Sequence, residues 1–482
     1  MNQNNDNFYI STTLPYTNSA PHLGFAAEII KADVIARYQN LLGKKVIFNT
    51  GTDEHGLKIQ QAANKIALSP RDYCTPYVEE FKSLIKVLNL SVSNFIRTSD
   101  EDHKKAAQHF WKLCEANGDI YKKSYKIKYC VGCEMEKKDS DLVAGSCPFH
   151  PNRDLEIIEE ENYFFRFSKY QSQLLDLYEQ NKDFVLPRHR FKEIKNFVSS
   201  GLQDFSISRL KSKMPNGVDV PGDSEQVMYV WFDALVNYIS TLSWPKVNSQ
   251  FNDFWPVVQV CGKDNLRQQS AMWQAMLLSA GLTPSKQILV FGFLTIDGEK
   301  ISKSQGKSID LFDLTNKFGY EALRYYLLSD IPTFEDGDFS EQRLILKYNA
   351  DLANGLGNLV SRLSNLLEKN KIKTNLRVTN KALIELANAS GLSNYQFNQS
   401  LQFIWQKISF CNETLSNKAP WKMESRDEII KVLIPLAEEV LDIATILQVF
   451  LPDSANKIIE LFSQEQITKS TSLFPRIDSK LN

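Results

Sequence analysis

The chain has 482 residues, of which 43% are hydrophobic and 23% are charged, and its formal net charge is −1. This length is too great for one hydrophobic core and predicts two to four domains. The near-neutral charge argues against a protein that coats nucleic acid generally, but it allows one with a local basic face.

Two segments bear on the compartment. Residues 1–7 are polar and lack the apolar core of a signal peptide. The most apolar later stretch, residues 432–451, contains Glu438, Glu439 and Asp442, which predicts an amphipathic helix and no membrane span. We therefore expect a cytoplasmic enzyme.

The first structured segment predicts a strand, a loop and a helix. Residues 8–13 are β-branched and aromatic, as in a buried strand. Turn-forming residues follow, and apolar side chains then recur at helical spacing over 23–41. The loop ends in Pro-His-Leu-Gly at 21–24, where the free N–H groups of a helix N-terminus can bind phosphate. The Gly-x-Gly-x-x-Gly pattern is missing from this loop, which disfavours a dinucleotide-binding fold.

A second strand is predicted over 45–50 and ends in Gly-Thr-Asp-Glu-His-Gly at 51–56. Ligands of open parallel sheets gather at the carboxyl ends of the strands. Asp53 could therefore hold an ammonium group through a charge-assisted contact, or it could cap the helix that begins near Leu57. For His55, packing is as good an explanation as substrate contact.

Three of the seven cysteines cluster with a histidine. Cys130 and Cys133 form a Cys-x2-Cys pair, and Cys147 and His150 form a Cys-x2-His pair after 13 further residues. This spacing predicts a closed tetrahedral zinc site with a structural role, remote from the reacting atoms. The alternative is a set of incidental thiols with a solvated histidine, and the pattern alone does not separate zinc from iron.

Between about 120 and 225 the alternation of strands and helices is interrupted. Short strands are predicted over 125–129 and 161–167 around the cysteine cluster. This region predicts an insertion between two halves of a parallel sheet. Its roughly 105 residues are too few for an additional hydrolytic domain.

The sheet is expected to resume after residue 228. In Tyr-Val-Trp-Phe-Asp-Ala at 229–234, Trp231, Ala234 and Tyr238 fall at helical spacing and could form an apolar slot or ordinary core. Strands are predicted over 256–261, before Gly-Lys-Asp at 262–264, and over 288–293. Lys-Ile-Ser-Lys-Ser at 300–304 follows a glycine-containing turn, and such a loop could bind phosphate or be merely solvated.

The remaining chain is mostly helical in pattern. Residues 321–328 predict a helix, and 334–339 predict a loop that acts as a hinge. From 340 to 474, apolar spacing predicts a bundle of four or five antiparallel helices. Since little chain follows the bundle, we expect a monomer.

Two motifs in this order identify a family resemblance. Pro-His-Leu-Gly at 21–24 resembles the first signature of class I aminoacyl-tRNA synthetases, and Lys-Ile-Ser-Lys-Ser at 300–304 resembles the second. Leu-Pro-Tyr at 14–16 and the motifs at 51–56, 229–234 and 262–264 are similar to the methionyl members of that family. The resemblance extends over essentially the whole chain.

The resemblance implies a fold and a set of domains. It implies an α/β protein with a Rossmann-like parallel-sheet catalytic domain, an inserted zinc-knuckle connective domain, and an all-α anticodon-binding helix bundle. The implied boundaries are 1–119 and 226–296 for the catalytic domain, 120–225 for the insertion, 297–339 for the second-signature loop and stem-contact region, and 340–482 for the bundle.

It also implies substrates and the residues that bind them: L-methionine, ATP with Mg²⁺, and tRNA(Met) with a CAU anticodon. The implied methionine-binding residues are Leu14, Tyr16, Asp53, Trp231, Ala234, Tyr238 and Gln269. The implied ATP-binding residues are His22, Gly24, Phe25, Gly262, Asp264, Lys300 and Lys303, of which His22, Lys300 and Lys303 are catalytic. The implied anticodon-binding residues are Asn358, Arg362 and Trp421.

The chain departs from the family pattern at two places. Phe25 replaces the second histidine of the first signature, and Gln268-Gln269 replaces a Phe-His pair that contributes to the methionine pocket. A phenyl ring cannot donate a hydrogen bond to phosphate, whereas the Gln269 amide can still donate one.

Two alternatives remain from the sequence alone. One is a synthetase for another apolar amino acid, such as leucine, isoleucine, valine or cysteine. The other is a tRNA-binding protein that kept the fold and lost the chemistry, which the intact His22, Lys300 and Lys303 disfavour.

Overall fold

The structure is a computed structural model that describes residues 6–137, 141–296, 298–300 and 309–477. The chain forms two compact units. The first contains Met1–Pro21, Lys45–Ser83 and Val92–Val290, and the second contains His22–Lys44, Leu84–Ser91 and Phe291–Asn482. None of the described helices has the length and apolar character needed to cross a membrane.

A six-stranded sheet underlies the first unit. Its strands are β1 (Asn7–Thr12), β2 (Lys45–Thr52), β3 (Asn94–Arg97), β7 (Val185–Leu186), β12 (Val258–Gly262) and β13 (Gln287–Phe291). They lie in the order β3-β2-β1-β12-β13-β7, and the pairs β1–β2, β1–β12, β2–β3 and β13–β7 are parallel. The predicted α/β class is confirmed. The chain order changes direction between β1 and β12, which is where open α/β sheets bind ligands beyond their strand ends.

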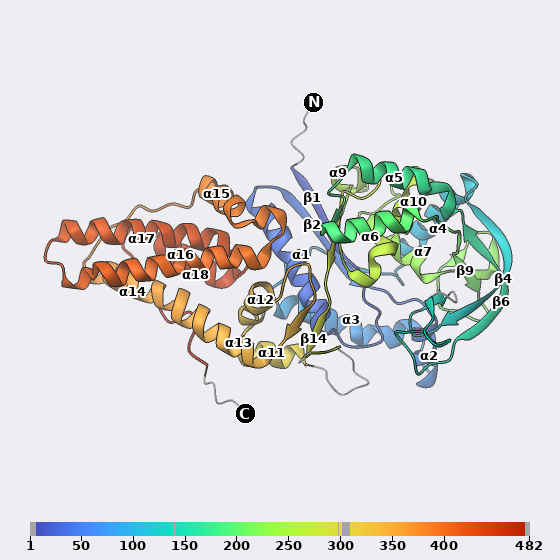
Figure 1. Cartoon of the computed structure of the whole chain (residues 1–482), viewed down its shortest axis with the longest axis horizontal. Coiled ribbons are helices and arrows are strands. Elements are labelled where there is room, and N and C mark those ends of the chain that lie inside the picture. The colour runs from blue at the N-terminus through green and yellow to red at the C-terminus, as the bar shows by residue number, and fades with distance from the viewer. Residues whose placement is uncertain (1–5, 138–140, 297, 301–308, 478–482) are drawn as a thin grey trace. The chain divides into compact units, whose positions relative to one another are not determined.

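The region between the two halves of this sheet is largely β-structure. β4 (Ile120–Cys130), β5 (Met135–Lys137), β6 (Glu156–Phe165) and β8 (Phe205–Ser206) form one sheet, and β9 (Ser208–Leu210), β10 (Asp219–Val220) and β11 (Asp223–Met228) form another. β4 and β6 form the long antiparallel pair at the edge of this region in Figure 1. The strands are longer than the predicted 125–129 and 161–167. β7 also lies within residues 120–225, but it pairs with β13 of the parallel sheet. Part of the inserted region therefore belongs to the six-stranded sheet.

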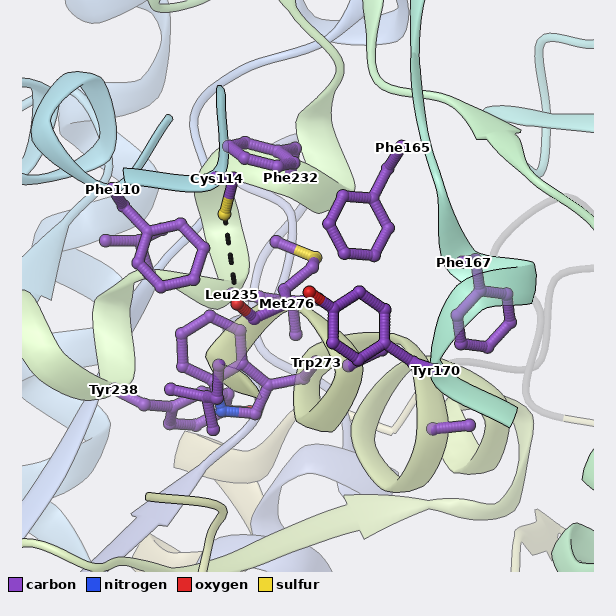
Figure 2. Close-up of a cluster of buried hydrophobic side chains, with 14 of the residues drawn as sticks. Phe110, Cys114, Phe165, Phe167, Tyr170, Phe232, Leu235, Tyr238, Trp273 and Met276 are labelled. Carbon is purple, nitrogen blue, oxygen red and sulfur yellow. Dashed lines mark hydrogen bonds between the residues drawn. The ribbon is translucent and has the colours of Figure 1, made fainter. Parts of the chain in front are cut away.

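Helices of the first unit enclose an aromatic core. They are α2 (Leu57–Lys65), α3 (Pro70–Val87, which extends into the second unit), α4 (Glu101–Ala116), α5 (Gln171–Gln180), α6 (Arg188–Ser199), α7 (Val230–Leu235), α8 (Asn237–Ser240), α9 (Phe251–Phe254) and α10 (Trp273–Ser279). In the core, Phe110 stacks on Trp273 at 5.4 Å and Phe232 meets Trp111 edge-on at 5.2 Å. Figure 2 shows Phe110, Phe232, Tyr238 and Trp273 converging from different elements. This core fixes α7 and α8, which carry three of the predicted methionine-binding residues.

The second unit begins with α1 (Leu23–Leu41), which matches the predicted helix over 23–41. Asp33 of α1 is buried and pairs with Arg324 of α12 (Tyr320–Ser329) at 2.7 Å and with Arg37 at 2.7 Å. Burial raises the pKa of Asp33, but the two guanidinium groups and hydrogen bonds from Ser91 hold it below its ordinary value. The ionised pair therefore ties α1 to α12.

The rest of the second unit is a small sheet followed by helices. The sheet contains β14 (Leu294–Ile296), β15 (Glu299–Lys300) and β16 (Gly337–Phe339), and β16 corrects the prediction of a loop over all of 334–339, because its backbone pairs with β14. The other helices are α11 (Leu311–Phe318), α13 (Glu341–Lys347), α14 (Asn358–Lys369), α15 (Asn380–Ser390), α16 (Phe397–Lys418), α17 (Arg426–Leu447) and α18 (Pro452–Phe462). α16, α17 and α18 run side by side in Figure 1, and the predicted helical C-terminal region is confirmed.

Candidate active site and metal-binding cluster

The loop after β1 is joined to the end of β2. Tyr16 and Asp53 form a parallel backbone bridge, in which the Asp53 amide donates to the Pro15 carbonyl at 2.9 Å and the Thr17 amide donates to the Asp53 carbonyl at 3.2 Å. These bonds hold Leu14, Tyr16 and Asp53 at the carboxyl ends of adjacent strands. The structure thus brings together three of the predicted methionine-binding residues.

Asp53 is a buried carboxyl group with an unusual electrostatic environment. It is 4% exposed, and Oδ1 accepts hydrogen bonds from the His55 amide at 3.2 Å and the Thr98 hydroxyl at 3.3 Å. Burial raises its pKa well above the ordinary value, and the nearby charges of Asp233 and Glu134 raise it further. A positively charged ligand beside Asp53 would offset the effect of burial and of these two neighbouring carboxyl groups.

His55 has a structural partner. Its Nδ1 lies 2.7 Å from Asp233 Oδ2, and both side chains are buried. This pair connects the end of β2 to α7. Asp233 was not predicted as a site residue, although the motif at 229–234 contains it.

The predicted apolar slot lies on α7, α8 and the π-helical turn Gln268–Met272. Ala234, Tyr238 and Gln269 are buried, and Trp231 is partly exposed. The Tyr238 ring lies 6.0 Å from Trp273, next to the core in Figure 2. The indole nitrogen of Trp231 is buried without a hydrogen-bond partner among the described residues.

The four predicted metal ligands converge. The ligand atoms of Cys130, Cys133, Cys147 and His150 all lie within 4.8 Å of one another. The Sγ of Cys133 is 3.5 Å from that of Cys147 and 3.3 Å from His150 Nδ1. Tetrahedral zinc with bonds of about 2.3 Å separates its ligands by roughly 3.8 Å, so these residues fit such an ion. Gly132 makes this approach feasible, because a Cβ there would lie 2.5 Å from the His150 ring.

The cluster is not remote from the candidate active site, which corrects the expectation stated above. Glu134 follows Cys133 directly, and its Oε1 accepts a hydrogen bond at 2.8 Å from the Lys58 amide at the start of α2. Tyr129 and Val131, on either side of Cys130, belong to a buried cluster against which Tyr16 and Trp231 pack. Residue spacing could not indicate the contact between Glu134 and Lys58, because the two residues are 76 positions apart.

His22 is the N-cap of α1. Its Nδ1 accepts a hydrogen bond from the Phe25 amide at 3.2 Å, which places the proton of a neutral ring on Nε2. A Cβ at Gly24 would lie 3.1 Å from the His22 ring. The Phe25 side chain is buried, with 8% exposure. The polar group that Phe25 brings to this loop is its backbone amide, which orients the His22 ring.

The other predicted nucleotide-binding residues follow two strands. Gly262 ends β12, and the exposed Asp264 lies just beyond it. In the second unit, Lys300 is the last residue of β15, which pairs with β14. Lys303 lies outside the described residues.

The three predicted anticodon-binding residues lie together at one end of the helical region. Arg362 of α14 is 5.6 Å from the centre of the Trp421 ring and donates to the Ser416 hydroxyl at 3.2 Å. Asn358, one turn earlier, donates to Asn412 at 3.5 Å. Trp421 is 48% exposed, so its ring is not part of the bundle core. Asn412 and Ser416 were missed as members of this cluster.

The family model for "tRNA synthetases class I (M)" matches residues 8–156 and 151–364. A methionine–tRNA ligase of Nostoc sp. is 39% identical over 481 residues, covering 95% of this chain and 90% of that protein. One of Thermotoga maritima is 38% identical over 482 residues, covering 95% of this chain and 76% of that protein.

Solved structures agree with these relatives. A methionyl-tRNA synthetase of Mycobacterium tuberculosis in complex with methionyl-adenylate is 34% identical, with a TM-score of 0.88 over 99% of this chain and 100% of that chain. A second structure of the same protein bound by methionyl-adenylate has a TM-score of 0.90 over 97% of this chain and 100% of that chain.

Proposed function

This chain belongs to the methionine–tRNA ligases of the class I tRNA synthetase family, and on that premise we propose a role for each candidate site. The enzyme activates L-methionine with ATP to methionyl-adenylate and pyrophosphate, and then transfers the methionyl group to tRNA(Met) for initiation and elongation of protein synthesis. The main support for the proposed methionine site is the buried Asp53 carboxyl group, which lies beside Tyr16 at the carboxyl ends of the strands.

Asp53 binds the α-ammonium group of methionine. The ammonium places a positive charge beside Asp53, whose pKa is raised by burial and by the nearby Asp233 and Glu134, and it therefore favours the ionised form of Asp53. The backbone bridge to Tyr16 keeps the carboxyl group in place, so binding requires little reorganisation.

The methionine side chain is surrounded by six residues: Leu14, Tyr16, Trp231, Ala234, Tyr238 and Gln269. Aromatic edges and a small residue suit an unbranched, polarisable thioether. The amide of Gln269 supplies the polar group that the family usually takes from histidine.

Adenylate formation is the attack of the methionine carboxylate on the α-phosphorus of ATP, with departure of pyrophosphate. Since no group must be deprotonated, catalysis consists of positioning and of stabilising charge on the phosphates. His22 donates from Nε2, and the Phe25 amide orients its ring. The Gly24 amide at the start of α1 adds a backbone donor, and Lys300 and Lys303 supply positive charge. Gly262 and Asp264 bind ATP, with Asp264 near the ribose, and Mg²⁺ enters with ATP through phosphate oxygens and water.

Asn358, Arg362 and Trp421 read the CAU anticodon. Proteins that recognise single-stranded RNA stack bases on aromatic rings and bind the base edges with polar groups. An exposed indole beside a guanidinium and an amide provides both. We further propose that the enzyme acts in the cytoplasm as a monomer and has no separate editing domain.

Cys130, Cys133, Cys147 and His150 bind one structural zinc ion. With all four positions taken by protein ligands, the metal supplies folding energy and no open coordination position. An ordered metal site also stabilises its neighbours. Glu134 contacts the start of α2, and Tyr129 and Val131 pack with Tyr16 and Trp231.

We expect Cys147→Ser to lose the metal and to raise the KM for methionine, because the knuckle supports Tyr16 and Trp231. Metal analysis should find about one zinc per chain in the parent, and limited proteolysis should cleave the variant first within 120–165. Cys411→Ser, which changes a buried cysteine of α16, is the control and should keep both metal and KM. Unchanged metal content in Cys147→Ser would reject the site.

ATP–pyrophosphate exchange with a panel of amino acids tests the function as a whole. Exchange with methionine alone is the expected result. Exchange with leucine, isoleucine, valine or cysteine at comparable kcat/KM would indicate a different amino-acid pocket. Exchange with none of them, together with binding of tRNA, would indicate a protein that kept the fold and lost the chemistry.

A further inference from the structure

Four buried side chains of the first unit form a continuous chain of hydrogen bonds. Gln259 of β12, Gln269, Gln274 of α10 and Ser285 are each at most 5% exposed. Gln259 Nε2 donates to Gln269 Oε1 at 2.6 Å, and the Ser285 hydroxyl donates to Gln259 Oε1 at 2.5 Å. Buried side-chain amides that hydrogen-bond to one another form a rigid network, and this network fixes the orientation of each side chain.

Backbone groups at both ends of the network determine which way each amide faces. The Ser285 backbone N–H can only donate, and it donates to Gln274 Oε1 at 2.9 Å. Gln274 Nε2 is therefore the donor side, and it bonds the Gln269 backbone carbonyl, which can only accept, at 2.7 Å.

Gln274 Nε2 also lies 3.2 Å from the Ser285 oxygen and 3.4 Å from Gln259 Oε1. The Ser285 hydroxyl, already accepting from Gln274, gives its own proton to Gln259 Oε1. Gln259 must then present its NH₂ to Gln269 Oε1. The network uses the Oε1 atom of Gln269 and leaves its Nε2 group to donate outside the network.

The network covers the same face of the sheet as the proposed methionine pocket. Gln259 is the register partner of Ser11, and Ser11 in turn is the register partner of Asn49, so the three side chains share one face. Asn49 donates to Ser11 at 2.9 Å and to Asn237 of α8 at 3.3 Å.

Tyr238 follows Asn237, and its ring contacts Trp273, the residue before Gln274. Figure 2 shows Tyr238 and Trp273 against each other. The network and the helical turns that carry Ala234 and Tyr238 thus occupy one layer above the sheet.

We propose that Gln259, Gln274 and Ser285 are positioning residues that hold the Gln269 amide with its NH₂ group toward the methionine side chain. A thioether sulfur is a weak hydrogen-bond acceptor, whereas a methylene accepts nothing. The fixed donor therefore favours methionine over norleucine, which has a methylene in place of the sulfur. This inference rests on the proposed function, in which Gln269 lines the methionine pocket.

The test compares two buried serines of similar exposure. Ser285→Ala removes the hydroxyl that orients Gln259, so the Gln259 and Gln269 amides are free to reverse. Ser279→Ala removes a hydroxyl that donates to Asp119 at 2.8 Å, outside the network. In ATP–pyrophosphate exchange, the ratio of kcat/KM for methionine to that for norleucine should fall about fivefold in Ser285→Ala and stay at the parental value in Ser279→Ala.

A double variant separates positioning from general structural damage. Gln269→Leu removes the donor and should lower the methionine-to-norleucine ratio by about the same factor, and adding Ser285→Ala should then change it no further. An unchanged ratio in Ser285→Ala, or an equal additional loss in the Gln269→Leu background, would overturn the proposal. Absence of methionine-dependent exchange in the parent would instead overturn the proposed function on which it rests.

Discussion

Replacing His22 by alanine is expected to lower kcat for methionine-dependent pyrophosphate exchange by more than about 10²-fold, the range lost with one donor to a developing oxyanion. The hydrogen bond from the Phe25 amide to Nδ1 holds the His22 ring and places the proton of the neutral ring on Nε2, the atom that we propose donates to a phosphate oxygen. This donor acts on charge that grows as pyrophosphate departs, and its loss should therefore appear in kcat more than in the KM for methionine.

His22 is also the N-cap of α1, and losing a cap costs about 1 kcal/mol of stability. His22→Asn provides the control, because asparagine retains a cap acceptor but places no donor where Nε2 lies. We expect His22→Asn to melt close to the parent while its kcat stays as low as that of His22→Ala. Exchange at the parental rate in either variant would show that His22 does not contact the phosphates.

Local patterns explain why parts of the site could be predicted from the sequence. The helical spacing that begins at Leu23 predicted the observed bounds of α1. A long apolar stripe with helical period that ends at Gly43 fits few structures other than a helix. The four metal ligands were likewise predictable, since two short Cys-x2 motifs each form a knuckle within a few residues. In both cases the determining residues are neighbours in sequence.

Contacts between distant segments were not predictable in the same way. β7 has only two residues and joins the sheet through β13, about a hundred positions later. Glu134 accepts a hydrogen bond from the Lys58 amide at the start of α2, which lies 76 positions earlier in the chain. The Gln259 network depends on the sheet register and on a π-helical turn, neither of which follows from residue spacing.

Replacing Trp421 by alanine is expected to reduce charging of tRNA(Met) by one to two orders of magnitude while methionine-dependent pyrophosphate exchange stays intact. Stacking of one base on an aromatic ring contributes ~1–3 kcal/mol, and each 1.4 kcal/mol is tenfold in affinity. The indole is 48% exposed and lies beside Arg362, so its removal takes away a binding surface without opening the bundle core.

The control is Phe410→Ala on α16, which removes an aromatic ring that is 66% exposed and is outside the proposed anticodon cluster. It should leave both reactions unchanged, whereas Trp421→Phe should keep part of the charging activity because a smaller ring still stacks. Equal loss of charging and of exchange in Trp421→Ala would mean that Trp421 supports the fold. Because Asn358 and Arg362 are assigned with Trp421 as one cluster, that result would remove the basis for all three anticodon assignments.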